Sequence, residues 1–205
     1  MEIQIDKEHI IQAALKLLNQ SGIHSLSMRK LADQLGIKAS SIYWHVKNKS
    51  ELLQLLAERI TEKISYPGEP FTWDKGLKVI ANNYLEVLLS YRDSAEIMMI
   101  TPPFTPNRLS LIEFVYSLFI KAGIPKEEIQ SAASLFNNYI LSFVMDEVKI
   151  GEQDQLTDLS KMQSFKDAEK YPLLASVHSP EKEQDMIQRF QWGLEVLISG
   201  FKSIK

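Results

Sequence analysis

The sequence contains no cysteine among its 205 residues. Disulfide bonds, thiol nucleophiles and zinc sites built on cysteine are therefore excluded. The four histidines, His9, His24, His45 and His178, show no metal-binding spacing. No nucleophile elbow, phosphate-binding loop or paired-carboxylate motif is present either. These absences argue against an enzyme, and we expect neither a metal nor another cofactor.

Long apolar runs are missing as well. No run reaches the roughly 18 residues that a membrane-spanning helix needs. The first residues, MEIQIDKEH, are polar and acidic, unlike a secretory signal. Hydrophobic residues make up 45% of the chain and charged residues 24%, which is ordinary for a soluble globular protein. We therefore expect a cytoplasmic protein with no membrane partner.

Positive charge is scarce in most of the chain and concentrated near its start. The formal net charge is −3, yet residues 1–66 hold nine Lys and Arg against seven Asp and Glu, a net of +2. The remaining residues, 67–205, therefore carry −5. Pro67 and Pro70 interrupt the chain between these parts, in the segment Ser65–Thr72. The pattern predicts two domains, 1–66 and 67–205, of which only the first suits a polyanion.

The segment Ser27–Lys49, SMRKLADQLGIKASSIYWHVKNK, has the pattern of a helix-turn-helix. Its first helix has apolar residues on one face and stops at Gly36, where a left-handed residue is needed. The second helix is predicted over Lys38–Val46, with Ile42 and Val46 four residues apart in the core. The second helix of such a motif lies in the DNA major groove.

Capping residues predict the neighbouring helices of this small domain. Asp6 is a predicted cap for a first helix that ends at Gly22, and Ser27 caps the next. Asn48 opens a further helix, with Glu51 three residues later in a capping-box arrangement.

The charge of the helix-turn-helix agrees with DNA binding. Between Met28 and Lys49 there are five cations and one anion, Asp33, a net of +4. Local charge matters here because phosphate contacts dominate affinity for duplex DNA. A solvated helical hairpin with ordinary surface lysines is the alternative. The residues that we expect to contact DNA are Ser27, Arg29, Lys30, Lys38, Ala39, Ser40, Ser41, Tyr43, Trp44, His45 and Lys49.

The run IYWHVKNKSELL, Ile42–Leu53, resembles the DNA-binding module of the TetR family of bacterial repressors, and the similarity extends over Leu17–Leu53. Tyr171–Leu174 and WGLEVLISG, Trp192–Gly200, also resemble the C-terminal domain of that family. The resemblance implies a homodimeric, all-helical regulator that binds a palindromic operator. It also implies a small molecule that binds the C-terminal domain and releases the protein from DNA.

The resemblance and the helix positions suggest roles in DNA binding for single residues of the motif. The resemblance places Tyr43 and His45 at the DNA backbone. Arg29 can read a guanine or contact a phosphate, and both remain open. Trp44 can belong to the core or to the contact surface. Lys49 stands in the first turn of a helix, where a cation is unfavourable unless an anion is bound, so we expect a DNA phosphate there.

The fold class predicted for the whole chain is all-α: a three-helix, helix-turn-helix DNA-binding domain and a larger helical domain for ligand binding and dimerisation. In the larger domain, periodicity and breakers predict a helix from Trp73, a short one over Asp93–Ile100, and others over Pro106–Ala122, Pro125–Ile150 and Glu181–Ser203. The segment Pro125–Ile150 is apolar on most sides, which predicts burial.

The last of these helices carries a heptad seam. Apolar residues recur at spacings of three and four: Ile187, Phe190, Leu194, Leu197, Phe201 and Ile204. One interpretation is packing within a single subunit. We favour a four-helix bundle between two subunits, made with Pro125–Ile150, because palindromic DNA requires a dimer.

The larger domain also supplies candidates for ligand binding. Aromatic and Met side chains with a few polar groups suit a bulky, mostly apolar molecule. The candidates are Tyr84, Met98, Met99, Phe104, Phe114, Phe136, Asn138 and Met145. Aligned through YRDSAEIMMI, Tyr91–Ile100, the magnesium-binding histidine of tetracycline-binding family members falls on Met98. A thioether cannot replace imidazole at magnesium, so we expect a different inducer, whose identity stays open, and no metal. The alternative function is a similar DNA-binding protein without a small-molecule ligand.

Overall fold

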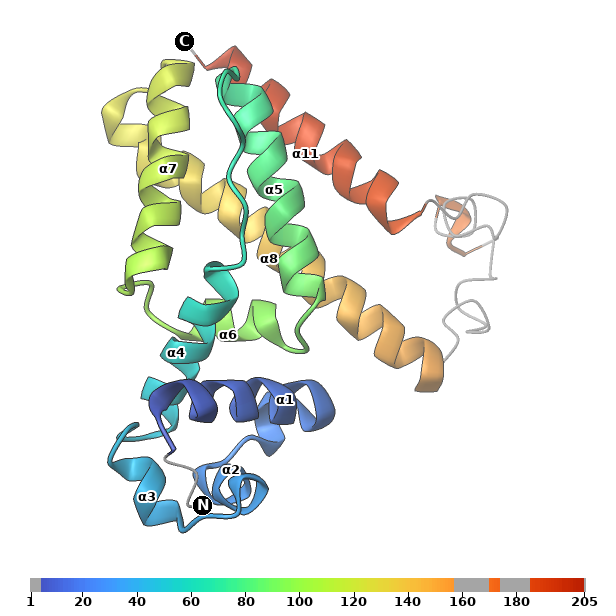
Figure 1. Cartoon of the computed structure of the whole chain (residues 1–205). Coiled ribbons are helices and arrows are strands. Elements are labelled where there is room, and N and C mark those ends of the chain that lie inside the picture. The colour runs from blue at the N-terminus through green and yellow to red at the C-terminus, as the bar shows by residue number, and fades with distance from the viewer. Residues whose placement is uncertain (1–4, 157–169, 174–184, 205) are drawn as a thin grey trace.

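In a computed structural model, the chain is described over residues 5–156, 170–173 and 185–204, and all regular structure in these ranges is helical (Figure 1). This confirms the all-α fold class. The helices are α1 Lys7–Ser25, α2 Met28–Leu35, α3 Ala39–Tyr43, α4 Lys49–Thr61, α5 Trp73–Leu89, α6 Ser94–Ile100, α7 Pro106–Ala122, the 3₁₀ helix η1 Lys126–Glu128, α8 Ile129–Leu156 and α11 Met186–Ser203.

The predicted caps of the N-terminal helices are present. The Asp6 carboxylate accepts from the backbone N–H of His9 at 2.9 Å, and the Asn48 side chain accepts from the N–H of Glu51 at 2.9 Å. Glu51 departs from a standard capping box, because its carboxylate accepts from the N–H of Lys47, at 2.8 Å, rather than from Asn48. Helix α4 therefore begins at a tightly bonded turn.

Two predicted helix boundaries in the N-terminal domain are wrong, and the helix predicted over Pro125–Ile150 is observed as α8, Ile129–Leu156, after the 3₁₀ helix η1. Helix α1 continues through a kink at Gly22 (φ 73°, ψ 169°) to Ser25 instead of ending there. Helix α3 ends at Tyr43, so the second helix of the motif is shorter than predicted. The chain turns after Tyr43, yet the N–H of Val46 still donates to the carbonyl of Ile42 at 2.9 Å, and both side chains are fully buried. The spacing of Ile42 and Val46 therefore predicted their burial correctly, but it did not predict where the helix ends.

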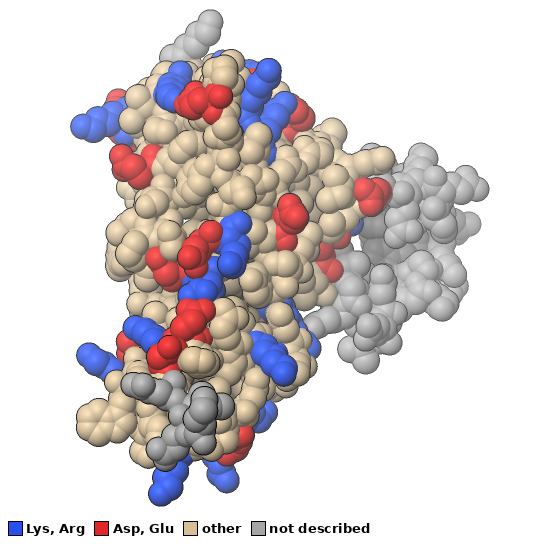
Figure 2. All heavy atoms as spheres, in the orientation of Figure 1, with Lys and Arg blue, Asp and Glu red and all other residues tan. Residues whose placement is uncertain are grey.

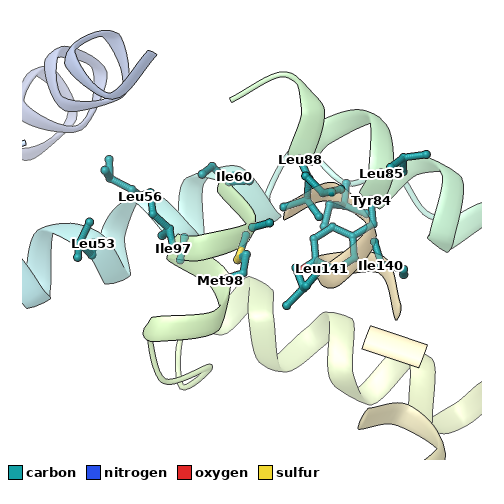
Figure 3. Close-up of a cluster of buried hydrophobic side chains, with 14 of the residues drawn as sticks. Leu53, Leu56, Ile60, Tyr84, Leu85, Leu88, Ile97, Met98, Ile140 and Leu141 are labelled. Atoms are coloured by element: carbon teal, nitrogen blue, oxygen red, sulfur yellow. The ribbon is translucent and has the colours of Figure 1, made fainter. Parts of the chain in front are cut away.

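Helix α6 lies between the N-terminal helices and the helices of the larger domain (Figure 1). Figure 3 shows its Ile97 and Met98 between Leu56 of α4 on one side and Tyr84 of α5 and Leu141 of α8 on the other. All five side chains are buried. One continuous hydrophobic cluster therefore joins the N-terminal helices to the larger domain.

Helices α8 and α11 pack closely within the subunit. Tyr139 of α8 donates its hydroxyl proton to the carbonyl of Phe190 at 2.7 Å. A Cβ atom on Gly193 would lie 2.4 Å from the Tyr139 oxygen, so this approach requires glycine. Phe190 and Leu194 are fully buried in this packing. The prediction that these seam residues face a second subunit is wrong, because they pack inside their own.

No helix within the described residues is long and apolar enough to cross a membrane.

Two glycines with similar φ permit a matched stability test. Gly22 (φ 73°, ψ 169°) has a conformation that is almost restricted to glycine, and an added Cβ would lie 2.8 Å from Asp93 Oδ2. Gly36 (φ 68°, ψ 29°) has left-handed helical angles, and nothing lies within 4 Å of an added Cβ. Gly36→Ala should cost about 1 kcal/mol of unfolding free energy, and Gly22→Ala about 2–3 kcal/mol. Urea denaturation monitored by circular dichroism measures both, and equal losses would show that the contact with Asp93 is unimportant.

Candidate DNA-binding surface and ligand cavity

The helix-turn-helix presents an exposed polar surface at one end of the molecule. Figure 2 shows Lys and Arg side chains projecting from this end, below α1 in Figure 1. Eight of the eleven predicted DNA-contacting residues are exposed: Arg29, Lys30, Lys38, Ser40, Ser41, Tyr43, Trp44 and His45. Ala39 is half-buried, as is Ser27, whose side chain accepts from the N–H of Lys30 at 3.2 Å.

Four cations on this surface have no ionic partner within the described ranges: Arg29, Lys30, Lys38 and Lys47. Several cations elsewhere are paired, although Lys16, Lys63, Lys75 and Lys126 have no ionic partner among the described residues. Arg59 bonds to Glu8 and Glu62, and Lys202 lies 2.7 Å from Asp74. Unpaired cations keep their full charge available to an incoming phosphate, because no carboxylate must first be displaced.

Lys49 differs from these four cations. It is half-buried, and its Nζ donates to the backbone carbonyl of Ile23 at 3.0 Å. The sequence argument placed a phosphate at Lys49 because a cation at a helix N-terminus needs a negative partner. In the structure the carbonyl of Ile23 is that partner, which gives Lys49 a role in joining α4 to α1.

Trp44 is 89% exposed, which removes the alternative that it belongs to the core. Tyr43 is 50% exposed beside it, at the end of α3. Large exposed rings next to unpaired cations are typical of a surface that becomes covered on binding. The C-terminal end of α3 therefore offers both apolar contact area and positive charge.

The second candidate site is a cavity of about 370 Å³ in the larger domain, within the size range of small-molecule sites. Its lining comes from α4, α5, the segment from α6 to α7, and α8. Five of the predicted ligand-binding residues line it: Tyr84, Met98, Met99, Phe136 and Asn138. The other lining residues are Thr61, Ile80, Thr101, Pro103, Arg108, Leu111, Ile112, Val115, Tyr116, Gln130, Ala133, Ser134, Asn137, Ile140 and Leu141.

The three other predicted ligand-binding residues lie outside this cavity. Phe104 is 77% exposed. Phe114 faces away, with its ring centroid 4.9 Å from that of Tyr66. Met145 lines a separate cavity of about 290 Å³ between α1, the start of α6 and α8. The structure does not bring these three residues to this cavity, because residue type indicates an apolar environment but not which side of the helix faces the cavity.

Sequence reasoning missed Arg108, a buried residue in the first turns of α7. Its Nη1 donates to the carbonyls of Thr101 and Pro102, each at 3.1 Å, and to Thr101 Oγ1 at 2.8 Å. Its Nη2 donates to the carbonyl of Met98 at 2.9 Å. Burial lowers the pKa of this guanidinium. A cation beside the last carbonyls of α6 stabilises the end of that helix. The signal in the sequence was a single Arg in an apolar helix, which alone does not indicate burial.

The opposite end of α6 is bonded to the DNA-binding domain. Asp93, immediately before α6, accepts from the N–H of Ile23 at 2.7 Å, and the N–H of Arg92 donates to Asn19 Oδ1 at 3.0 Å. Ile23, which donates to Asp93, and Asn19, which accepts from Arg92, both belong to α1. The helix that lines the cavity at Met98 is thus bonded to the DNA-binding domain through the residue that precedes it.

Comparison with known proteins agrees with this two-part arrangement. The family model for bacterial regulatory proteins of the tetR family matches residues 10–56, and that for the tetracyclin repressor-like C-terminal domain matches residues 66–204. The chain belongs to the TetR family. A tetracycline repressor protein of class D from Escherichia coli is 32% identical over 202 residues, which cover 97% of this chain and 90% of that repressor. These TetR relatives are transcriptional regulators.

Solved structures of TetR proteins share the whole fold. The protein ActR of Streptomyces coelicolor, in complex with (S)-DNPA, is 27% identical and superimposes with a TM-score of 0.81, covering 97% of this chain and 98% of ActR. A TetR variant from Acinetobacter baumannii, in complex with minocycline, is 29% identical with a TM-score of 0.74, covering 97% of each chain.

Lys38 provides the test of the unpaired cations. Lys38→Ala should weaken binding to every DNA sequence alike and reduce the slope of log K against log salt by about one. Fluorescence anisotropy at several salt concentrations measures this slope. Lys126→Ala, which removes the same charge from η1 in the larger domain, should leave the slope unchanged. A changed base preference without a changed slope would contradict a phosphate contact.

Proposed function

We propose that this chain is a ligand-responsive transcriptional repressor that acts in the bacterial cytoplasm. Two copies bind a palindromic operator, with recognition helices α3 in major-groove faces about one helical turn apart, roughly 34–36 Å. A bulky, mostly apolar molecule enters the cavity and releases the protein from DNA. The ligand complexes of ActR and of the minocycline-binding relative support a ligand role for the C-terminal domain.

The observation that carries this proposal is the position of α6. One end is bonded to α1 through Asp93, and the other end lines the cavity through Met98 and Thr101. A ligand that displaces α6 therefore also displaces α1 and α4, and the separation of the two DNA-binding domains changes. The ligand acts only through its different affinities for the two states. A ratio of about 10⁴, near 5.5 kcal/mol, moves a population from 1:99 to 99:1.

Release from DNA requires no magnesium in this proposal. Met98 lines the cavity, and its sulfur lies 4.0 Å from the Thr61 hydroxyl. A thioether is a soft ligand, whereas magnesium prefers oxygen donors and retains its water. The inducer is therefore bound without a metal bridge at this position, in contrast to what the resemblance implies for tetracycline-binding relatives.

The proposed dimer interface uses the outer surfaces of α8 and α11. Leu135 of α8 is 58% exposed, and Trp192 and Val196 of α11 are 71% and 52% exposed. Trp192 and Val196 are four residues apart and share one face of the helix. Asn138 and Ser142 are exposed on the Leu135 side of α8, contrary to the expected burial of that helix on nearly all sides. An exposed apolar surface of this kind is typical of a subunit interface.

The alternative, a DNA-binding protein of the same fold without a small-molecule ligand, needs no internal space. The cavity of about 370 Å³ beside α6 favours the hypothesis of a ligand-responsive repressor.

Selection of bound fragments from a random DNA pool tests the proposed function. We expect an inverted repeat with half-sites about one helical turn apart. The double variant Trp192→Glu with Val196→Glu should sediment as a folded monomer, because charges placed in the interface remain desolvated in the dimer. It should also select single half-sites.

The control for this variant is Ile120→Glu, which changes another exposed apolar residue, on α7, and should leave the dimer intact. Recovery of no preferred sequence would contradict the proposed function. A double variant that stays dimeric would place the interface elsewhere.

A further inference from the structure

The cavity contains one charged residue, Arg108. The twenty residues that line it include no Asp, Glu, Lys or His. Arg108 is only 8% exposed, so its charge is shielded from bulk water. A buried cation is costly unless it is paired or fully hydrogen-bonded. The groups that balance the positive charge of Arg108 therefore influence which ligands the cavity can bind.

Protein groups compensate Arg108 only in part. All four of its hydrogen bonds use the two terminal nitrogens, and the acceptors are Met98, Thr101 and Pro102. Its Nε donates to no described residue, and no carboxylate of the described ranges lies within ion-pair distance. The carbonyls at the end of α6 supply the equivalent of about half an elementary negative charge. The carboxylate of Glu58 accepts from the backbone N–H of Asn107 and acts to raise the pKa of the guanidinium, but it forms no ion pair with Arg108.

A second buried donor lines the same cavity. Tyr84 of α5 is 5% exposed, and its hydroxyl forms no hydrogen bond with any residue in the described part of the chain. Figure 3 shows its ring beside Leu141, within the buried hydrophobic cluster. Burial raises the pKa of Tyr84, and the positive charge of Arg108 acts in the opposite direction. The phenol is therefore a neutral donor that lacks an acceptor.

We propose that the ligand of this cavity carries an anionic oxygen, a carboxylate or an acidic phenol or enol, that accepts from Arg108 and from the Tyr84 hydroxyl. This inference rests on the proposed function and refines its ligand class. The rest of the ligand is mostly apolar, since Ile80, Leu111 and Val115 also line the cavity. The anion gives Arg108 a direct ionic partner, which no carboxylate of the described residues provides, and hydrogen bonds to a charged group are stronger than those to a neutral one.

Matched aromatic acids and amides test the charge requirement with the full chain. The probes are 2-naphthoate and 2-naphthamide, and the larger pair anthraquinone-2-carboxylate and anthraquinone-2-carboxamide. Isothermal titration calorimetry should show at least one carboxylate binding tenfold or more tightly than its amide. Phenol analogues, 2-naphthol and 1-hydroxyanthraquinone, titrated above and below their own pKa values, distinguish a carboxylate from an acidic phenol as the preferred anion.

Variants assign the preference to the two residues. Tyr84→Phe removes an unpartnered hydroxyl, so the fold should persist, and the ratio of carboxylate to amide affinity should fall roughly three- to tenfold. Tyr116→Phe removes the same atom from another lining residue and should leave the ratio unchanged. Arg108→Gln should bring the two affinities within about twofold of each other, and Arg108→Lys should restore part of the preference.

The outcomes separate this inference from the proposed function. Equal affinity for acid and amide, or binding of neither pair at millimolar concentration, would overturn the anionic subsite. The proposed function is judged independently by DNA selection, which needs no ligand. The anionic subsite would also be overturned if Tyr84→Phe and Tyr116→Phe reduced the ratio of carboxylate to amide affinity equally, because the effect would not be specific to the Tyr84 hydroxyl.

Discussion

The hydrogen bond from the Ile23 amide to the Asp93 carboxylate, 2.7 Å long, connects the two functional parts of this TetR-family chain. It depends on Gly22, whose backbone angles and missing side chain leave room for the carboxylate. Lys49 donates to the carbonyl of the same residue, Ile23, so α1, α4 and the start of α6 meet at one residue. At the other end of α6, Arg108 holds three carbonyls. The helix is thus held by a charged side chain at each end.

This arrangement gives α6 few ways to move independently. Its buried side chains pack between α4, α5 and α8 (Figure 3), and a close-packed interior transmits displacement because it has little free volume to absorb it. The cavity adjoins the end held by Arg108, whereas the DNA-binding domain is bonded to the end held by Asp93. A ligand near Arg108 therefore acts on the segment whose position sets the orientation of α1 and α4. The proposed anionic subsite would place the ligand charge at that point.

Local signals predicted much of the fold. Helix α7 was predicted at its observed limits, because Pro106 is suited to a helix start and Gly123 takes the left-handed angles of a helix end. Ile42 and Val46 were predicted in the core for their spacing and are buried there. The seam of α11 shows the limit of such reasoning. Its periodicity identified an apolar face, but only the packing of Tyr139 against Gly193 shows that Phe190 and Leu194 face their own subunit.

The candidate sites were harder to predict than the fold. Charge concentration identified the DNA-binding surface, since the unpaired cations are also neighbours in sequence. The cavity joins residues from four segments, so Phe104 and Phe114 were assigned to it on residue type alone. Arg108 was missed because its hydrogen bonds go to three carbonyls six to ten residues away, which the turn between α6 and α7 brings to one guanidinium.

The most direct measurement of the coupling through α6 compares operator affinity with and without saturating anthraquinone-2-carboxylate, in wild type, Asp93→Gly and Glu96→Gln. Asp93 has a φ of 54°, so glycine preserves the backbone while removing the carboxylate, and Glu96 is a neighbouring acid of the same helix with no bond to α1. We predict at least tenfold weaker DNA binding with the probe in wild type and in Glu96→Gln, within the usual range of allosteric coupling. Asp93→Gly should bind the probe equally well but show less than a threefold effect on DNA. An undiminished effect in Asp93→Gly would contradict coupling through this hydrogen bond.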